Sequence, residues 1–210
     1  FTSSALRVQN FPVFYLPYLV WPIKQERAPG LLMPTFGYSD RRGFNIGLPV
    51  FLPVGRSYDT TIFADYYTNG YYGLGNEWRW VPRADASGRS LGYAIWDEAN
   101  QEWQWRYNLV HTQADLYGFR LLVELEDLSD VDFFQEFDRT FEANTRRSLY
   151  SQIYLTRSHG PATLNLRADR RMTFLTNTDV ELMQLPEAEL RVRSTSIGGS
   201  PVYWDLVSSL

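Results

Sequence analysis

The sequence predicts an all-β protein built as an antiparallel up-and-down meander. Most of the chain after residue 30 alternates apolar and polar residues with a period of two, which is typical of strands and not of helices. Short turn sequences separate these runs, and no apolar run approaches the ~18 residues that a membrane-spanning helix needs. We therefore expect roughly eleven strands joined by short links over residues 31–210.

Composition narrows the class of protein. Apolar residues make up 44% of the chain and aromatic residues 16%, which argues against disorder. The net charge is −4 and Lys24 is the only lysine among 20 basic residues, so there is no basic footprint for a nucleic acid. There are no cysteines, which removes a disulfide framework and leaves the redox compartment open. The chain opens in mid-pattern without a signal peptide, so we interpret it as a mature or excised segment and expect an open, curved sheet with unsatisfied edges.

The first element is a proline-rich stretch at residues 11–34, FPVFYLPYLVWPIKQERAPGLLMP. Its aromatic and branched residues favour strands, but proline has no N–H to give to a ladder and belongs at sheet edges, strand ends or bulges. The stretch therefore predicts an apolar sheet edge that pairs poorly. Its prolines are Pro12, Pro17, Pro22, Pro29 and Pro34.

The elements that follow are alternating runs with one apolar and one polar side. The clearest runs are 71–81, 103–109, 118–126, 162–170, 187–193 and 202–209. Asn69-Gly70 predicts a tight hairpin with a type I′ turn, because this dipeptide tolerates positive φ. Residues 126–146 break the pattern and hold seven acidic residues, so they form either a solvated acidic loop or one short amphipathic helix within it.

Alternation alone fits both a half-buried soluble sandwich and a lipid-facing barrel. Two features favour the barrel. Opposite charges sit together on the polar side, as in Glu77 with Arg79 and Arg167 with Asp169, which a wet lumen tolerates. Tryptophan and tyrosine residues also gather near strand ends, as in the aromatic girdles of membrane barrels.

The sequence contains little that predicts catalysis. His111 and His159 are isolated, without a second ligand at metal spacing, and are expected to be structural. Glu187 and Glu189 share one strand face and are expected to be solvated polar residues, not a glycosidase pair. Gly73 and Gly75 lie on a strand and not in a phosphate loop. We therefore expect no catalytic residues, no metal and no cofactor.

Arginine on the polar side is more informative, because guanidinium groups bind phosphate bidentately and stay charged. A lumen lined in this way could meet an anionic amphiphile, although pairing with neighbouring carboxylates explains the same residues equally well. The lumen-facing candidates are Glu77, Arg79, Arg106, Arg120, Arg167, Arg191 and Arg193.

Several segments resemble LptD, the lipopolysaccharide-assembly family also known for organic-solvent tolerance. PVFYLPYLVWPI at 12–23, followed by GLLMP at 30–34, is similar to the passage from the family's periplasmic jelly roll into its barrel. LSDVDFFQEFD at 128–138 and LPEAEL at 185–190 resemble later parts of that barrel. The absence of cysteine departs from the well-studied members, whose inter-domain disulfides would have to lie outside this chain.

The resemblance implies an architecture and a place in the cell. Residues 1–10 would end the jelly roll, residues 11–30 would form the proline-rich junction, and residues 31–210 would supply the first ten or so strands of an incomplete transmembrane β-barrel in the bacterial outer membrane. Strands 31–39, 58–68 and 118–126 would then run outward, and the acidic loop at 127–146 would be extracellular.

The resemblance also implies a function. Family members accept lipopolysaccharide from an LptA-type bridge of periplasmic jelly-roll proteins, hold an LptE-type lipoprotein plug in the lumen, and release the lipid into the outer leaflet. Release occurs through a lateral gate between the first and last barrel strands. Candidate gate prolines are Pro12, Pro17, Pro22 and Pro34. Two alternatives stay open from the residues alone: a porin- or adhesin-type barrel, and a soluble, aromatic-rich, carbohydrate-binding β-sandwich.

Overall fold

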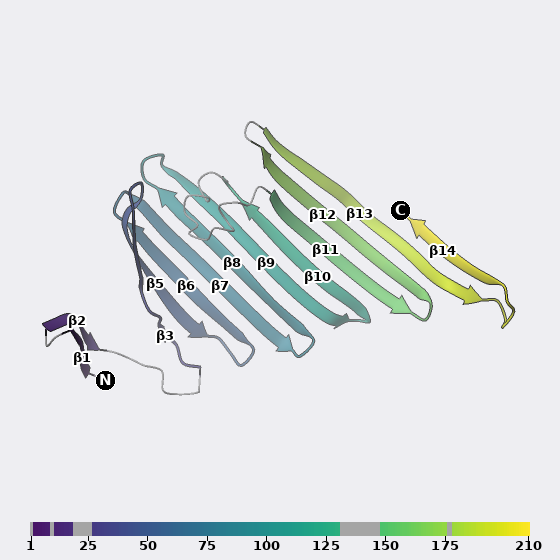
Figure 1. Cartoon of the computed structure of the whole chain (residues 1–210), viewed down its shortest axis with the longest axis horizontal. Coiled ribbons are helices and arrows are strands. Elements are labelled where there is room, and N and C mark those ends of the chain that lie inside the picture. Colours follow the sequence, from purple (N-terminus) through teal and green to yellow (C-terminus); the bar gives the residue numbers. More distant parts are fainter. Residues whose placement is uncertain (1, 9–10, 19–26, 131–147, 176–177) are drawn as a thin grey trace.

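A computed structural model describes residues 2–8, 11–18, 27–130, 148–175 and 178–210. Every element in this part of the chain is a strand (Figure 1). The strands are β1 (Thr2–Val8), β2 (Phe11–Tyr18), β3 (Gly30–Leu31), β4 (Thr35–Ser39), β5 (Gly43–Pro53), β6 (Tyr58–Tyr67), β7 (Tyr71–Arg83), β8 (Ala86–Asp97), β9 (Glu102–Leu116), β10 (Phe119–Leu128), β11 (Ser148–His159), β12 (Ala162–Leu175), β13 (Thr178–Ser196) and β14 (Tyr203–Ser209).

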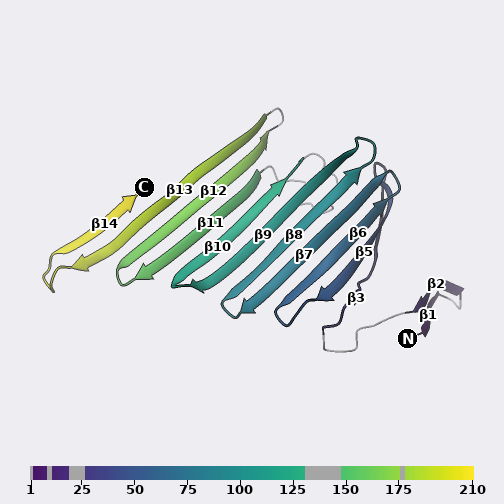
Figure 2. The same cartoon turned by 180° about the vertical axis from the view of Figure 1, so that it is seen from behind.

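These strands form two sheets. β1 and β2 make a separate antiparallel pair, and the other strands form a 12-stranded sheet in which each strand from β5 to β14 lies beside its neighbours in sequence. All pairings are antiparallel, so the prediction of an all-β, up-and-down meander is confirmed. Among the described strands, β14 pairs only with β13, while β3 and β4 pair only with β5, so the sheet is open as expected (Figure 2).

The alternating runs in the sequence coincide with strands. The runs at 71–81, 118–126 and 162–170 fall on β7, β10 and β12, each within one residue of the strand start. The run at 187–193 lies in the C-terminal half of β13. This strand begins at Thr178, well before the alternation is clear. A period of two is a local property of the strand backbone, so the alternating runs predicted the positions of these strands correctly.

The prediction of a type I′ turn at Asn69-Gly70 is wrong, although the hairpin is present. A type I′ turn needs positive φ at both central residues. Among described non-glycine residues, only Gln101 and Tyr117 have positive φ, whereas Gly70 has φ 84°. The loop has three residues, 68–70, with Gly70 N–H donating to the Tyr67 carbonyl at 3.2 Å, as in a type I turn followed by a glycine bulge.

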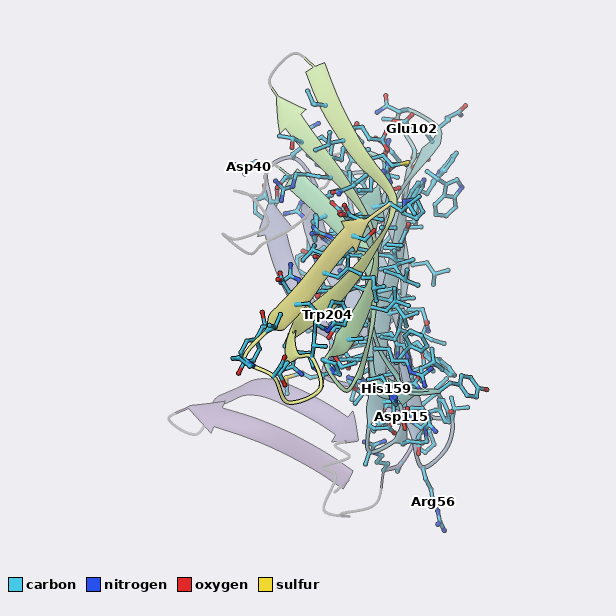
Figure 3. All side chains as sticks on the ribbon, turned by 90° about the vertical axis from the view of Figure 1, so that its right-hand side faces the viewer. Asp40, Arg56, Glu102, Asp115, His159 and Trp204 are labelled. Atoms are coloured by element: carbon cyan, nitrogen blue, oxygen red, sulfur yellow. The ribbon has the colours of Figure 1, made fainter. Side chains whose placement is uncertain are left out.

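The 12-stranded sheet is a single layer in the described part of the chain (Figure 3). Its buried hydrophobic residues are few, and Ile95 is the largest side chain that is fully buried. Many large apolar side chains on one face are exposed instead, among them Leu74 at 58% and Trp103 at 56%. A β-sandwich would require a second sheet packed over this face, so the described sheet does not support the sandwich alternative.

The two ends of the strands carry loops of different length. At one end, marked by Asp40 and Glu102 in Figure 3, β10 ends at Leu128, and β11 begins at Ser148. At the other end, marked by Arg56 and His159, the links from β5 to β12 span two to four residues. The acidic segment predicted at 126–146 begins as strand, because β10 continues to Leu128, and residues 131–147 lie outside the described residues. No helix capable of crossing a membrane occurs in the described ranges.

Candidate functional site at the first-strand edge

The first edge of the large sheet is interrupted in its middle. Strands β3 and β4 both pair with β5 and together form one broken edge strand. Leu31 lies opposite Val50, whereas Thr35 lies opposite Gly47, so the register shifts by one residue between the two halves. Pro34 falls within this interval and has no N–H to donate to β5.

β5 also lacks a donor at this point. The Leu32 N–H donates to the carbonyl of Pro49 at 2.8 Å. In an antiparallel pair, the nitrogen and oxygen of a residue face the same neighbouring strand. The nitrogen of Pro49 therefore also faces the edge strand, where it cannot donate. Pro49 thus removes a donor from the ladder at the level where Pro34 lies in the break of the edge strand.

The structure places the four predicted gate prolines in different surroundings. Pro12 and Pro17 lie in β2, whose partner is β1 and not the large sheet. Pro22 lies outside the described residues. Pro34 is at the break in the edge strand. Reasoning from the sequence missed Pro49, although a proline inside the alternating run FNIGLPVFLP is itself a signal for edge pairing.

The strand register separates the sheet into a polar face and an apolar face. Asp59 on β6 is opposite Arg79 on β7, which is opposite Arg89 on β8. Following the register across the remaining strands places all seven lumen-facing candidates on this same polar face. They are Glu77, Arg79, Arg106, Arg120, Arg167, Arg191 and Arg193.

Carboxylates pair with several of these arginines. Arg79 Nε donates to Asp59 Oδ1 at 2.6 Å, and its Nη1 lies 3.6 Å from Glu77 Oε1. Arg89 Nε lies 2.6 Å from the same Glu77 oxygen. Asp59 is only 7% exposed, so this chain of ion pairs is partly shielded from water. It crosses β6, β7 and β8 near the end of the sheet marked by Arg56 in Figure 3.

A second polar network joins β11, β12 and β13. The Tyr154 hydroxyl and the Thr156 hydroxyl both donate to Asn165 Oδ1, at 3.0 Å and 2.7 Å. Asn165 Nδ2 donates to Glu189 Oε2 at 3.0 Å, and Arg191 Nη2 donates to Glu189 Oε1 at 2.8 Å. Glu189 is thus occupied by an amide and a guanidinium. The network presents hydroxyl, amide and charged groups on one continuous polar surface.

The opposite face is apolar and has aromatic residues at two levels. Tyr66 and Tyr72 contact each other at one end with a ring separation of 5.6 Å, and Trp96 and Trp103 do so beside them at 5.5 Å. Trp80 marks the other end of β7. Between these levels the face carries branched side chains, chiefly Leu48, Val50, Ile62, Leu74, Leu109, Val123, Leu125, Ile153, Leu155 and Leu166.

His111 belongs to this apolar face, where it contacts Trp80. Trp80 Nε1 donates to His111 Nδ1 at 3.1 Å, and the rings stack with centroids 5.8 Å apart. The indole covers Gly88, which lies between the two residues in register. His159 is exposed at the end of β11. No group of three His, Cys, Asp or Glu residues in the described part of the chain could hold a metal ion.

One ionic cluster lies on the apolar face, toward the end of the sheet where the long β10–β11 link leaves it. Arg170 on β12 donates to Asp127 on β10 at 3.0 Å and to Glu181 on β13 at 2.5 Å. Ser151 lies on β11 between them and exchanges hydrogen bonds with the backbone of Glu126. The cluster joins four strands on a face whose other side chains are mostly apolar.

A sheet with one polar face and one apolar face bordered by aromatic residues has the pattern of a membrane β-barrel wall. Comparison with known proteins gives the particular family. The sequence model described as "LptD protein" matches residues 1–197, and the chain therefore belongs to the LptD family.

Individual relatives agree with this assignment. The LPS-assembly protein LptD of Legionella pneumophila (strain Lens) is 28% identical over 176 residues, covering 73% of this chain and 20% of that protein. The LptD of Ectopseudomonas mendocina is 29% identical, covering 74% of this chain and 17% of its own length. That of Bordetella pertussis is 30% identical, covering 64% and 17%. The chain thus spans about a fifth of the length of these relatives.

Proposed function

We propose that this chain is the first part of an outer-membrane barrel that inserts lipopolysaccharide into the outer leaflet. The relatives that support this proposal are named LPS-assembly proteins. In this assignment residues 1–10 end a periplasmic jelly roll, residues 11–30 join it to the barrel, and residues 31–210 are barrel wall. The start of the large sheet at Gly30 supports the boundary between the junction and the barrel wall.

The dimensions of the apolar face suit a membrane. Tyr72 and Trp80 mark its two aromatic levels on β7 and are eight residues apart. At about 3.3 Å per residue they are separated by about 26 Å along the strand. A strand tilt of about 40° reduces this to about 20 Å across the membrane, close to the apolar band of about 25 Å in outer-membrane barrels.

The interrupted first strand is the observation that supports a lateral gate. In hydrocarbon an unpaired backbone group costs several kcal/mol, so membrane barrels normally close every seam with a full ladder. Each ladder hydrogen bond contributes about 0.5–1.5 kcal/mol net. Pro49 removes a donor from the first strand pair and Pro34 lies in the break of the edge strand, which together lower the cost of moving that strand. An edge that moves easily allows acyl chains to leave the barrel sideways.

The polar face supports a passage for the sugar-bearing part of the lipid. Its arginines, hydroxyls and amides can exchange hydrogen bonds with sugar and phosphate groups. An LptE-type lipoprotein plug would occupy the same lumen, and an LptA-type bridge would deliver lipopolysaccharide from the periplasm. This function is transport, without a catalytic step.

The gate can be tested by replacing the two prolines at the break. We expect the double variant Pro34→Ala/Pro49→Ala in the full-length protein to deliver less lipopolysaccharide to the cell surface at equal barrel abundance. Pro161→Ala, in the turn before β12, is the matched control. A disulfide joining the first strand to the last strand of the complete barrel should stop delivery. Normal delivery with the disulfide formed would refute the gate.

The topology can be tested by labelling. A periplasmic N-terminal domain places the Tyr117 turn in the periplasm and the Asn100 turn outside the cell. Cysteine at Asn100 should react with an impermeant reagent added to intact cells, and cysteine at Tyr117 should not. The reverse result would overturn this orientation. A porin-type function would instead predict ion conductance by the purified protein and no defect in lipopolysaccharide delivery.

A further inference from the structure

One ion pair connects the segment before the first strand to the polar face of the sheet. Arg27 Nη1 lies 3.2 Å from Asp59 Oδ2 on β6. The Arg27 side chain is 58% exposed, whereas the Asp59 side chain is 9% exposed. Arg27 is three residues before β3, so its side chain passes over the end of β5 to reach β6.

The backbone ladder ends just where this ion pair begins. Gly30 is opposite Phe51, and the next residue of β5 that faces the edge strand is Pro53. Pro53 has no N–H to offer, so only its carbonyl could extend the ladder. No strand is assigned at residues 27–29, and the described ladder ends at Gly30. The side chain of Arg27 supplies a connection to the sheet beyond this end.

Asp59 is well placed to hold this arginine. Arg79 binds its other oxygen, Oδ1, at 2.6 Å, so the two guanidinium groups occupy different carboxylate oxygens. Glu77 and Arg89 extend the chain of ion pairs from Arg79 to β8. Asp59 also lies opposite Pro53 in register, directly across β5 from the edge. Its orientation is thus set by interactions that do not involve Arg27.

We infer that Arg27 and Asp59 form a latch, an ion pair that holds the N-terminal end of the first strand, near Gly30, to the sheet. The latch resists displacement of this end from the sheet. The inference rests on the proposed lateral gate and adds a contact that restrains the edge strand of that gate. The prolines weaken the ladder between the edge strand and β5. The latch bypasses β5 and connects the edge to β6. The edge strand is then held at its N-terminal end by the ion pair and is weakly bonded at the break between Leu31 and Thr35.

Hydrogen exchange measured on the full-length protein extracted from its membrane tests the latch. The reporter is the Leu32 amide, whose N–H bonds to Pro49 in the edge ladder. We expect Arg27→Gln to speed exchange in the peptide containing Leu32 by about two- to fivefold, the range for loss of a partly exposed ion pair. Arg27→Lys keeps the charge and should exchange at nearly the wild-type rate. Arg56→Gln is the matched control, because Arg56 projects away from the same end of the sheet (Figure 3).

Unchanged exchange in Arg27→Gln would overturn the latch, as would equal acceleration in Arg27→Lys and Arg27→Gln. Exchange reports the motion of the edge strand whether or not lipopolysaccharide crosses it. Failure of the latch would therefore be visible in exchange alone. Failure of the proposed function would appear in lipopolysaccharide delivery by the proline and disulfide variants.

Discussion

Replacing Gly73 with alanine should destabilise the polar face through a side chain of the neighbouring strand. Tyr93 on β8 crosses the glycines of β7, and its hydroxyl donates to Asp65 Oδ2 on β6 at 2.5 Å. A Cβ at Gly73 would lie 2.2 Å from the Tyr93 hydroxyl oxygen and 2.9 Å from Cζ. These distances are far below contact, so the ring must lift from the sheet and release Asp65.

The size of the effect follows from what is lost. A hydrogen bond to a charged group contributes about 1.5–3 kcal/mol. Tyr93→Phe removes the hydroxyl and with it this bond, and we expect it to cost about 1.5 kcal/mol. Gly73→Ala also displaces the ring and should cost about 2–3 kcal/mol. Because both variants lose the same bond, the double variant should cost about 1–2 kcal/mol less than the sum of the two.

Urea unfolding of the full-length protein in detergent, followed by tryptophan fluorescence, measures these free energies. Gly92→Ala on β8 is the control, because a Cβ there meets nothing within 4 Å and should change stability little. Strict additivity of Gly73→Ala and Tyr93→Phe would refute the shared hydrogen bond. Equal stability of Gly73→Ala and Gly92→Ala would refute the close packing of Tyr93 on β7.

Three further substitutions test other parts of the sheet. In Gly88→Ala the new Cβ would lie 2.2 Å from the Trp80 ring, so we expect a loss of about 1–3 kcal/mol and a shift in tryptophan emission; unaltered emission would count against the packing. Arg170→Ala leaves Asp127 unpaired on the apolar face and should lower the free energy of urea unfolding by about 1–3 kcal/mol. The double variant Arg170→Met/Asp127→Asn should recover most of this loss. No recovery would contradict the ion pair as the cause. Gly118→Ala places a side chain at φ 83° and should lower stability by about 1 kcal/mol in thermal unfolding, and an unchanged midpoint would show that the turn tolerates L-residues.

Turn chemistry shows where local signals become ambiguous. Asn69-Gly70 has the composition of a type I′ turn, yet the loop has three residues and only its glycine has positive φ. In the two-residue loop Tyr117-Gly118 both residues do have positive φ, at 54° and 83°. Tyrosine is a poor predictor of that conformation. Its φ is imposed by the pairing of Leu116 with Phe119, which leaves two residues to reverse the chain.

The proline-rich edge shows a different kind of limit. Proline removes a donor wherever it stands, but the loss weakens a sheet only if the nitrogen faces a partner strand. Pro12 and Pro17 belong to another pair of strands, whereas the overlooked Pro49 faces the edge strand near the break that contains Pro34. Pairing between strands determines which nitrogens face each other, and a single alternating run does not contain that information.

The sequence by itself therefore determined the positions of most strands, their polar and apolar sides, and the side on which the seven candidate residues lie, because alternation is a property of each strand alone. The family was also recognisable from short segments. Only the tertiary structure decided which prolines meet, that Tyr93 crosses two glycines to reach Asp65, and that Arg27 reaches Asp59. These contacts join residues far apart in the chain, and their geometry depends on strand order and register, which are set by the whole sheet.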